Sequence, residues 1–486
     1  MIRVRFAPSP TGYLHIGNVR TALFNYLFAK RHGGKFILRV EDTDLERSKP
    51  EYREALVEDL SWMGIRWDEG PGMDGEYGPY LQSERLQLYQ ERVQKLIAEG
   101  KAYYCYVTEA ETEESKRLAR LEKRPPRFEN KGRNFSKEEI EKRKAAGIKP
   151  TVRFRIENPK LQMHDLVRGE VHFNLDEMVG DFVIVRADGN PTFHLAVCVD
   201  DGLMNVTHVI RGEDHLSNTP KHILLLEAMG FKPPQYGHLS LIHGAGGEPL
   251  SKRLESVSIR EFRKLGYMPH ALANYIALLG WSPGDNRELF SWEDLQKTFD
   301  MDRVNKSSSI YDPHKLDWVN GEHLRLIPEE EFCRRALAYL KDQKLLKHDE
   351  TLVHRILPVF KDNIERFNQL PEKLELLSDD LHYENRDLIE SEEGREICKA
   401  ALEVLNEVVG APLAGAQTGQ AQGLPLQYDD FVNALKPKVK AKGKNLFMPL
   451  RIALTGKAHG PELKRIFPVL GIAKVKGRFE RALTKG

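Results

Sequence analysis

The sequence predicts a multidomain protein. It has an α/β domain built on a parallel sheet, an α+β insertion within that domain, and an all-α C-terminal third. Three observations predict this class. Strand-like and helical segments alternate up to about residue 81. Residues 82–189 combine helical segments with several short strands, and only helical periodicity follows Glu329. At 486 residues the chain is long enough for about three to four domains.

The first eighty residues read as strand, helix, strand, helix. The apolar runs Ile2–Phe6 and Lys35–Glu41 predict strands, with an amphipathic helix over Val19–Arg31 between them and another over Glu51–Met63. Gly33-Gly34 supplies a helix stop signal. This alternation predicts a right-handed βαβ unit in a parallel sheet.

The pattern changes after residue 82. An amphipathic helix over Leu86–Gly100 leads into short strands predicted at Ala102–Thr108, Thr151–Ile156, Glu170–Asn174 and Asp181–Arg186. We therefore interpret residues 82–189 as an α+β insertion. The parallel sheet is then expected to resume with the strand Asn205–Ile210, the helix Asn218–Met229 and the strand Gln235–Ile242.

The remaining chain is helical in pattern, first over 259–322 and again past Glu329. The segment Val409–Gln427 is rich in Gly, Ala, Gln and Pro, which predicts a linker or loop. We interpret it as a tolerated insertion without a function of its own.

Composition and charge narrow the class of protein. The chain is 41% apolar and 30% charged, which is typical of a globular protein, and no apolar run approaches the roughly 20 residues that cross a bilayer. No secretory signal precedes the first strand, so a cytoplasmic location is expected. The four cysteines are widely scattered, which argues against a disulfide framework.

The net charge of +1 is unevenly distributed. Basic residues outnumber acidic ones by sixteen to nine in Glu111–Lys160 and by fourteen to two in Ala434–Gly486. Such patches on a balanced protein suggest a polyanionic partner. The alternative is solubilising surface charge, and it is a serious one for the first stretch, where Glu and Lys alternate at helical spacing.

The loop after the first strand carries the strongest local signal, Arg5-Phe6-Ala7-Pro8-Ser9-Pro10-Thr11-Gly12-Tyr13-Leu14-His15-Ile16-Gly17-Asn18. A loop that leads into a helix start presents unpaired N–H groups and a positive dipole end, which suit a phosphate. His15 and Asn18 can donate hydrogen bonds there, and Gly17 lets the backbone approach a ligand closely. The alternative is an ordinary strand–loop–helix with a solvated His15.

A second segment, Pro249-Leu250-Ser251-Lys252-Arg253, follows several glycines and could place cations over a triphosphate. The first segment resembles the HIGH signature of class I aminoacyl-tRNA synthetases, here His15-Ile16-Gly17-Asn18, and the second resembles their KMSKS loop. Three further blocks occur in family order, Val40–Asp44, Pro191–His194 and Val209–Asp214. With them, the chain resembles bacterial glutamyl-tRNA synthetases along its whole length, most closely before about Asn320.

The resemblance implies a division of the chain into regions. A Rossmann-like catalytic domain would occupy residues 1–81 and 190–258, with a connective, acceptor-binding insertion over 82–189. A helical stem-contact region would follow over 259–325, and an all-α anticodon-binding region over 326–486. It also implies a monomer, with tRNA(Glu) and L-glutamate as partners and no membrane. Charging of tRNA(Gln) as well stays open.

The resemblance also assigns the nucleotide site. ATP with Mg²⁺ is expected to bind at Thr11, His15, Gly17, Asn18, Ser251, Lys252 and Arg253. Among these, His15, Asn18 and Lys252 would be catalytic, because adenylation brings two anions together while pyrophosphate leaves, and so needs positioning and charge stabilisation. Pro249 departs from the family, which usually has Lys at that position.

The glutamate site is expected at Arg5, Ala7, Ser9, Glu41, Phe193 and Arg211. The two arginines would hold the two carboxylates and Glu41 the ammonium group, since buried charges need opposite partners. As an alternative, Arg5 and Glu41 could simply pair with each other. Phe193 stands where the family usually has Tyr, and Val197 replaces a polar residue of some relatives. His194 and His215 are further candidates for the pocket lining.

Two other expectations follow from the resemblance. Asp44 is expected near the 3′ end of the tRNA. Some relatives bind a structural zinc after the tyrosine-rich strand, but here Cys105 keeps only one thiol, and Val107 and Asn134 replace ligands, so no zinc is expected.

Three alternative functions remain to be weighed against a glutamate–tRNA ligase. A nucleotidyltransferase of the same fold that stops at the adenylate is disfavoured by the basic insertion and the helical C-terminal third. A non-catalytic tRNA-binding relative is disfavoured by intact His15, Glu41 and Lys252. Truncated relatives that glutamylate a modified base lack the C-terminal region that is present here.

Overall fold

The structure is a computed structural model that describes residues 1–44, 46–73, 75–125, 128, 130–178, 180–248, 250, 257–410 and 427–484. Contacts along the chain divide it into two compact units. The first consists of Met1–Arg263 and Pro269–Leu316, and the second of Lys264–Met268 and Asp317–Gly486. Each unit is described by itself.

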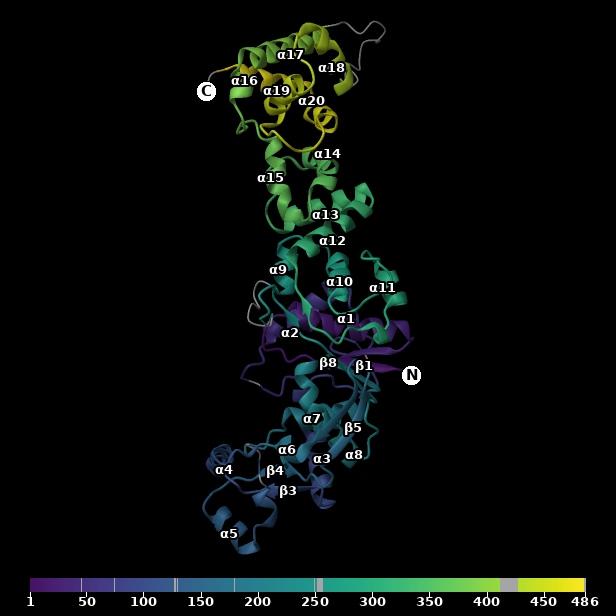
Figure 1. The fold of residues 1–486 in the computed structure, drawn as a ribbon, viewed down its shortest axis with the longest axis vertical. Coiled ribbons are helices and arrows are strands. Elements are labelled where there is room, and N and C mark those ends of the chain that lie inside the picture. The colour runs from purple at the N-terminus through teal and green to yellow at the C-terminus, as the bar shows by residue number, and fades with distance from the viewer. Residues whose placement is uncertain are drawn as a thin grey trace. The chain divides into compact units, whose positions relative to one another are not determined.

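A parallel sheet forms the centre of the first unit (Figure 1). The strand β1 (Arg3–Phe6) pairs in parallel with β2 (Lys35–Leu38), and α1 (Ile16–Arg31) connects them. The strand β8 (His208–Gly212) pairs in parallel with β9 (Gln235–Leu239). The Thr207 N–H donates to the Arg3 carbonyl at 2.9 Å, which brings the start of β8 beside β1. The predicted alternation of strand and helix is therefore found.

A hairpin from within residues 82–189 joins this sheet. Its strands are β5 (Lys160–Asp165) and β6 (Gly169–Asn174), and Asp165 pairs in parallel with Tyr236 of β9. The strand order is β6-β5-β9-β8, and β1-β2 forms a separate two-stranded sheet linked to it through the bond of Thr207 to Arg3. The prediction contained β6 but not β5, because the sequence Lys-Leu-Gln-Met-His-Asp carries little apolar signal and only Asp165 of the strand is fully buried. The boundaries of the four expected regions stay a prediction.

The other insertion strands form a separate antiparallel sheet in the order β3-β4-β7. Their bounds are β3 Ala102–Cys105, β4 Thr151–Phe154 and β7 Phe182–Val185, close to those predicted. Tyr89, Phe154, Phe182 and Leu195 share one core cluster there. The helices of this part are α3 (Leu86–Ala98), α4 (Glu109–Leu121), α5 (Lys137–Ala145), α6 (Leu175–Met178) and α7 (Phe193–Leu203).

The rest of the first unit is mostly helical. It contains α2 (Pro50–Trp62), α8 (Thr219–Ala228), α9 (Ile259–Lys264), α10 (Pro269–Leu278) and α11 (Trp292–Thr298), and a short parallel pair of β10 (Ile242–His243) with β11 (Ser309–Ile310). The strand β11 interrupts the helical pattern that the sequence predicted over 259–322.

The described residues of the second unit contain helices and no strand (Figure 1). The helices are α12 (Pro313–Leu326), α13 (Glu329–Asp342), α14 (Glu350–Phe360), α15 (Leu370–Leu374), α16 (Asp387–Glu390), α17 (Glu392–Gly410), α18 (Tyr428–Leu435), α19 (Lys444–Thr455) and α20 (Leu463–Leu483). Most of the predicted linker Val409–Gln427 lies outside the described residues. Within the part of the chain that is described, no helix is long and apolar enough to cross a membrane.

Gly266 shows why Lys264–Met268 belongs with the second unit. Its carbonyl accepts the Phe367 N–H at 3.2 Å, and its φ of +79° lies in the left-handed region. A Cβ at this position would lie 2.8 Å from the Phe367 Cβ and 2.9 Å from the Asn368 nitrogen. Only glycine fits this close approach without strain.

We expect Gly266→Ala to lower the free energy of unfolding by about 2 kcal/mol, because it adds both backbone strain and a clash. Urea unfolding of the purified variant measures this. Gly100→Ala is the matched control, because Gly100 has a φ of +71° but a Cβ added there would have no other atom within 4 Å. Equal losses in the two variants would show that the contact with Phe367 contributes nothing.

Candidate active site

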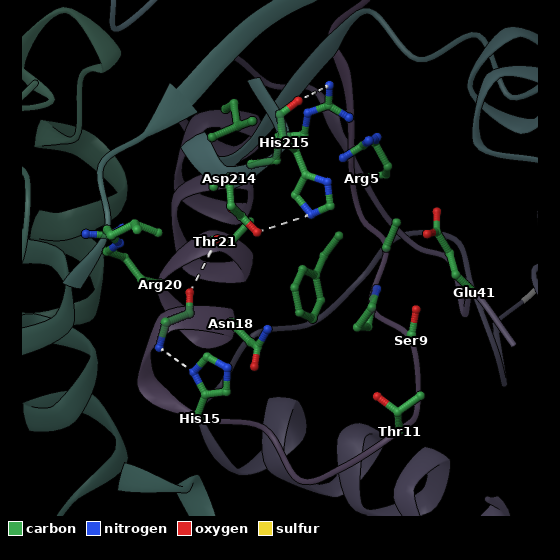
Figure 2. A pocket seen from close by; sticks show the side chains of 18 of the residues that line it. Arg5, Ser9, Thr11, His15, Asn18, Arg20, Thr21, Glu41, Asp214 and His215 are labelled. Atoms are coloured by element: carbon green, nitrogen blue, oxygen red, sulfur yellow. Dashed lines mark hydrogen bonds and ion pairs between the residues drawn. The ribbon is translucent and has the colours of Figure 1, made fainter. Parts of the chain in front are cut away.

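The first unit contains a cavity of about 680 Å³ at the carboxyl ends of β1 and β8 and the start of α1. Ligands in open α/β sheets commonly bind at this edge. Among the residues that the sequence analysis singled out, the following line it: Arg5, Ala7, Ser9, Thr11, His15, Gly17, Asn18, Glu41, Phe193, Val197, Arg211 and His215. Figure 2 shows Thr11, His15 and Asn18 at one end of this pocket and Arg5 and His215 at the other.

The end of the pocket near α1 is built for an anion. His15 is the residue before the helix, and its Nδ1 accepts the Gly17 N–H at 3.1 Å. The ring proton of the neutral imidazole therefore lies on Nε2, which can donate. Burial lowers the pKa of His15 and favours this neutral form. The first turn of α1 contains no acidic residue that would occupy its positive end.

The predicted lysine loop can be located only by its ends. Pro249, Ser251, Lys252 and Arg253 lie outside the described residues. Leu250 lines the pocket, and the Ile259 N–H donates to the Leu14 carbonyl at 2.9 Å. On the C-terminal side of this segment, the chain is therefore bonded to the residue that precedes His15.

Buried charged groups form a network beneath the pocket, in which Arg39 also pairs with Asp200 at 3.9 Å and Asp200 with Arg85 at 2.6 Å. The Arg5 Nε donates to the Asp201 Oδ1 at 3.1 Å, and the Arg39 Nη1 donates to the same oxygen at 2.7 Å. The Arg39 Nη2 donates to the Glu41 Oε1 at 3.0 Å. Arg5 and Glu41 therefore bond to other groups, and the direct pairing that was the alternative to substrate binding is not what the structure has. Arg39 and Asp201 were not among the predicted site residues.

The pKa values of the two carboxyl groups reflect this network. Burial raises the pKa of Glu41, and the nearby charges of Arg39 and Arg5 only partly offset that effect. Burial would also raise the pKa of Asp201, but its contacts with Arg5 and Arg39 outweigh burial and lower it. The pairing with two arginines therefore favours the charged form of Asp201 more than the single pairing with Arg39 favours that of Glu41.

Arg211 is surrounded differently. It is 6% exposed, yet no carboxylate forms an ion pair with it among the described residues. Its Nη2 donates to the Thr219 Oγ1 at 2.8 Å, its Nη1 to the His222 Nδ1 at 3.2 Å, and its Nε to the His238 Nε2 at 3.3 Å. Burial lowers the pKa of Arg211 to about 10, so it stays charged at neutral pH. This buried positive charge is stabilised by neutral acceptors and suits an anionic ligand.

The wall of the pocket between these ends is partly apolar. The rings of Phe193 and His215 lie 5.7 Å apart, and Val197 also lines this part of the pocket.

Two of the predicted residues that the structure describes do not line the pocket. His194 is not among the lining residues, and its Nδ1 lies 3.0 Å from the His222 Nε2. Asp44 is also outside the lining, and its Oδ2 accepts from the Arg47 Nε at 2.7 Å.

Several lining residues were missed by the sequence analysis, including Arg20 and Thr21 on α1 and Asp214 after β8. Arg20 and Thr21 lie one helical turn beyond Gly17 and Asn18, so helical spacing was the signal that could have found them. Asp214 ends the family block Val209–Asp214 and carried no separate signal. The roles of all the lining residues, as distinct from their positions, stay predictions.

We expect Arg39→Met to destabilise the protein by about 3–5 kcal/mol, because it leaves Asp201 and Glu41 with less positive charge in a buried site. Urea unfolding measures the loss. Arg117→Met is the control, since Arg117 pairs with Glu114 on the exposed surface of α4 and its removal should change stability little. A similar loss in both variants would contradict the network's importance.

Comparisons with known proteins agree with this architecture. The family described as tRNA synthetases class I (E and Q), catalytic domain, matches residues 1–318, and the family described as anticodon binding domain matches residues 331–483. These matches confirm the predicted fold class of a catalytic α/β domain followed by a helical anticodon-binding region.

Relatives match over nearly the whole chain. A glutamate–tRNA ligase of Sulfurihydrogenibium sp. is 44% identical and covers 99% of both chains, and glutamate–tRNA ligase 1 of Caldicellulosiruptor saccharolyticus is 42% identical over 99% of this chain and 98% of its own. The crystal structure of a glutamate–tRNA ligase from Elizabethkingia meningosepticum in complex with its amino acid has a TM-score of 0.85 at 29% identity, with 99% of both chains covered. The chain belongs to the glutamate–tRNA ligase family of class I aminoacyl-tRNA synthetases.

Proposed function

We propose that the protein attaches L-glutamate to the 3′ end of tRNA(Glu) in an ATP-dependent reaction through a glutamyl-adenylate. The observation that carries this proposal is a single pocket with two different ends. One end has the start of α1 with His15 and Asn18, and the other has the buried Arg211, which forms no ion pair with a described carboxylate. The first suits the phosphates of ATP and the second suits a carboxylate of the amino acid.

In the first step, an oxygen of the glutamate α-carboxylate attacks the α-phosphorus of ATP, and the bond to pyrophosphate breaks. His15, through its Nε2–H, and Asn18 would donate to the α-phosphate oxygens as charge develops, with Gly17 and Thr11 lining the approach. Ser251, Lys252 and Arg253 would stabilise the leaving pyrophosphate. In the second step, a hydroxyl of the terminal tRNA ribose attacks the activated carbonyl and AMP leaves.

The phosphates of ATP themselves would carry Mg²⁺, which usually binds through phosphates and water. When bound, Mg²⁺ neutralises phosphate charge. For the tyrosine-rich strand we propose no structural zinc, since Cys105 provides one thiol and Val107 and Asn134 provide no ligand.

Glutamate would bind with its ammonium group at Glu41 and its carboxylates at Arg5 and Arg211, supported by Ala7, Ser9 and Phe193. The two arginines are not equivalent. Arg5 shares Asp201 with Arg39, so much of its charge is already neutralised, whereas Arg211 contacts only neutral groups. We propose that Arg211 supplies the larger part of the attraction for the substrate carboxylate.

The tRNA would contact the insertion, with Asp44 near its 3′ end, and the helical second unit. We further propose that the protein is a cytoplasmic monomer. Charging of tRNA(Gln) is to be tested beside that of tRNA(Glu). The nucleotidyltransferase that never meets RNA is disfavoured by the anticodon binding domain matched over 331–483.

Charging assays with separate tRNA(Glu) and tRNA(Gln) transcripts test the function directly. Wild-type protein should charge tRNA(Glu) with glutamate, and Lys252→Ala should do so at least about 100-fold more slowly, as expected for a charge-stabilising group. Lys297→Ala on the exposed side of α11 is the control and should charge normally. No charging by the wild type would refute the function, whereas a normal rate in Lys252→Ala would refute only the role of Lys252.

The glutamate site is tested by Arg211→Gln and Arg5→Gln. Arg211→Gln should weaken glutamate binding by about 3 kcal/mol, because it leaves a substrate carboxylate unpaired in a buried pocket. In steady-state charging this appears as a KM for glutamate raised roughly 100-fold. Arg5→Gln should have the smaller effect on KM because Asp201 already neutralises Arg5. Arg287→Gln, in an exposed loop, is the control. Unchanged glutamate kinetics in both pocket variants would place the substrate elsewhere.

A further inference from the structure

A histidine and an aspartate lie directly behind Arg211. His238 is in β9 and Asp165 ends β5, and both side chains are fully buried. The His238 Nε2 lies 3.3 Å from the Arg211 Nε, and the His238 Nδ1 lies 2.5 Å from the Asp165 Oδ2. The three side chains therefore form a chain of hydrogen bonds that ends at the pocket.

The position of the ring proton follows from the partners of His238. A guanidinium group has only donors, so the Nε2 of His238 must accept and the ring proton must lie on Nδ1. The Nδ1–H then donates to the Asp165 carboxylate. Burial lowers the pKa of His238 although Asp165 opposes this, which agrees with a neutral ring.

Asp165 is itself held in place by the backbone. Its Oδ1 accepts the N–H groups of Val167 and Arg168, each at 2.9 Å, and that of His238 at 3.2 Å. Burial would raise the pKa of Asp165, but the hydrogen bonds from His238 and from the backbone outweigh burial and lower it. The carboxylate therefore stays charged and oriented, and it fixes one ring orientation and one tautomer of His238.

The bonds of Arg211 leave little freedom for the guanidinium. Of its five N–H groups, four are used in the described hydrogen bonds, one from Nε to His238, one from Nη1 to His222, and two from Nη2 to Thr219 and the His215 carbonyl. The fifth N–H, on Nη1, takes part in none of these bonds to described residues, and it is the one that we assign to a ligand. Its direction depends on how Nε is held.

We propose that His238 and Asp165 are positioning residues that aim the Nη1 of Arg211 into the pocket without neutralising its charge. A carboxylate in direct contact with Arg211 would cancel the charge that attracts the substrate. The neutral imidazole separates the two charged groups and still supplies an oriented acceptor for Nε. This inference rests on the proposed glutamate site and adds two residues to it that do not line the cavity.

Asp165→Asn is the sharpest test, because it preserves the shape of the site. The Asn oxygen can still accept the three backbone N–H groups, while its amide would donate to the His238 Nδ1. The ring proton would then move to Nε2, where it can donate to the Thr219 Oγ1, which lies at 3.0 Å, and Nε2 could no longer accept from the Arg211 Nε. We expect the KM for glutamate to rise roughly ten-fold or more, as when imidazoles at metal sites lose an orienting partner. We expect kcat at saturating glutamate and the KM for ATP to change less than about two-fold, because the α1 end of the pocket is untouched.

Substitutions of His238 provide an independent comparison. His238→Gln keeps an oxygen that can accept from the Arg211 Nε and should give a KM for glutamate closer to wild type than His238→Leu, which has no acceptor. His208→Gln is the matched control, because His208 contacts Thr207 and Phe28 and does not line the pocket. Thermal unfolding midpoints of all variants show which of them fold.

The outcomes separate the two proposals. If wild-type protein does not charge tRNA(Glu), the proposed function fails. If it does, a wild-type KM for glutamate in Asp165→Asn, or a parallel loss of ATP and glutamate affinity, overturns the positioning role. If Asp165→Asn does not fold, equal glutamate KM values in His238→Gln and His238→Leu overturn it. A selective rise in KM with rescue by Gln supports it.

Discussion

The pocket depends on how its buried charges are paired. Arg39 is fully buried, and its guanidinium joins Asp201 to Glu41 at the ends of β2 and α7. Because desolvation makes an isolated buried charge very unfavourable, loss of Arg39 would remove the ion pair of Glu41 and leave Asp201 with Arg5 alone. The same Asp201 holds Arg5 of β1. Three segments that are far apart in sequence are thus tied together beneath the ligand by one set of ion pairs.

Within this setting, Arg5 and Arg211 have different electrostatic roles. Because Arg5 forms an ion pair with Asp201, it stabilises the buried base of the pocket as well as being available to contact a ligand. Arg211 instead keeps its charge among imidazoles, a hydroxyl and a carbonyl. A neutral setting of this kind gives a buried arginine a strong preference for an incoming anion, because the ligand supplies the only full negative charge in contact with it.

Much of the fold could be predicted from local patterns. The helix α1 was found because its apolar residues recur at helical spacing, and it begins three residues before the predicted Val19 because His15 caps it. The strand β5 was missed because its burial comes from tertiary pairing of one residue, Asp165, and not from an apolar alternation. Most of the predicted loop residues between Arg5 and Asn18 line one pocket, since a strand end and the following helix start are neighbours in space as well as in sequence, and their roles there stay predictions.

The supporting residues of the site could not be predicted in the same way. Arg39, Asp201, Asp165 and His238 carry no motif, and their importance arises only when separate strands bring them into contact. The alternative to substrate binding that the sequence left open was a direct ion pair between Arg5 and Glu41. The partner chosen by the fold, Asp201, is almost two hundred residues away from Arg5. Local sequence signals identify the residues that line a pocket better than they identify the residues that position those side chains.

The hairpin of β5 and β6 has a consequence for the modularity of the molecule. It lies within residues 82–189, yet its first strand contributes to the central sheet and its end reaches the back of the pocket. Arg168, in the turn that follows, pairs with Glu213 after β8. An excision that joined residue 81 directly to residue 190 would therefore remove an edge of the catalytic sheet. A minimal catalytic fragment, or a chimera with a transplanted insertion, would have to retain the native hairpin. Exchange of the insertion during evolution is likewise constrained by the need to keep β5 paired with β9.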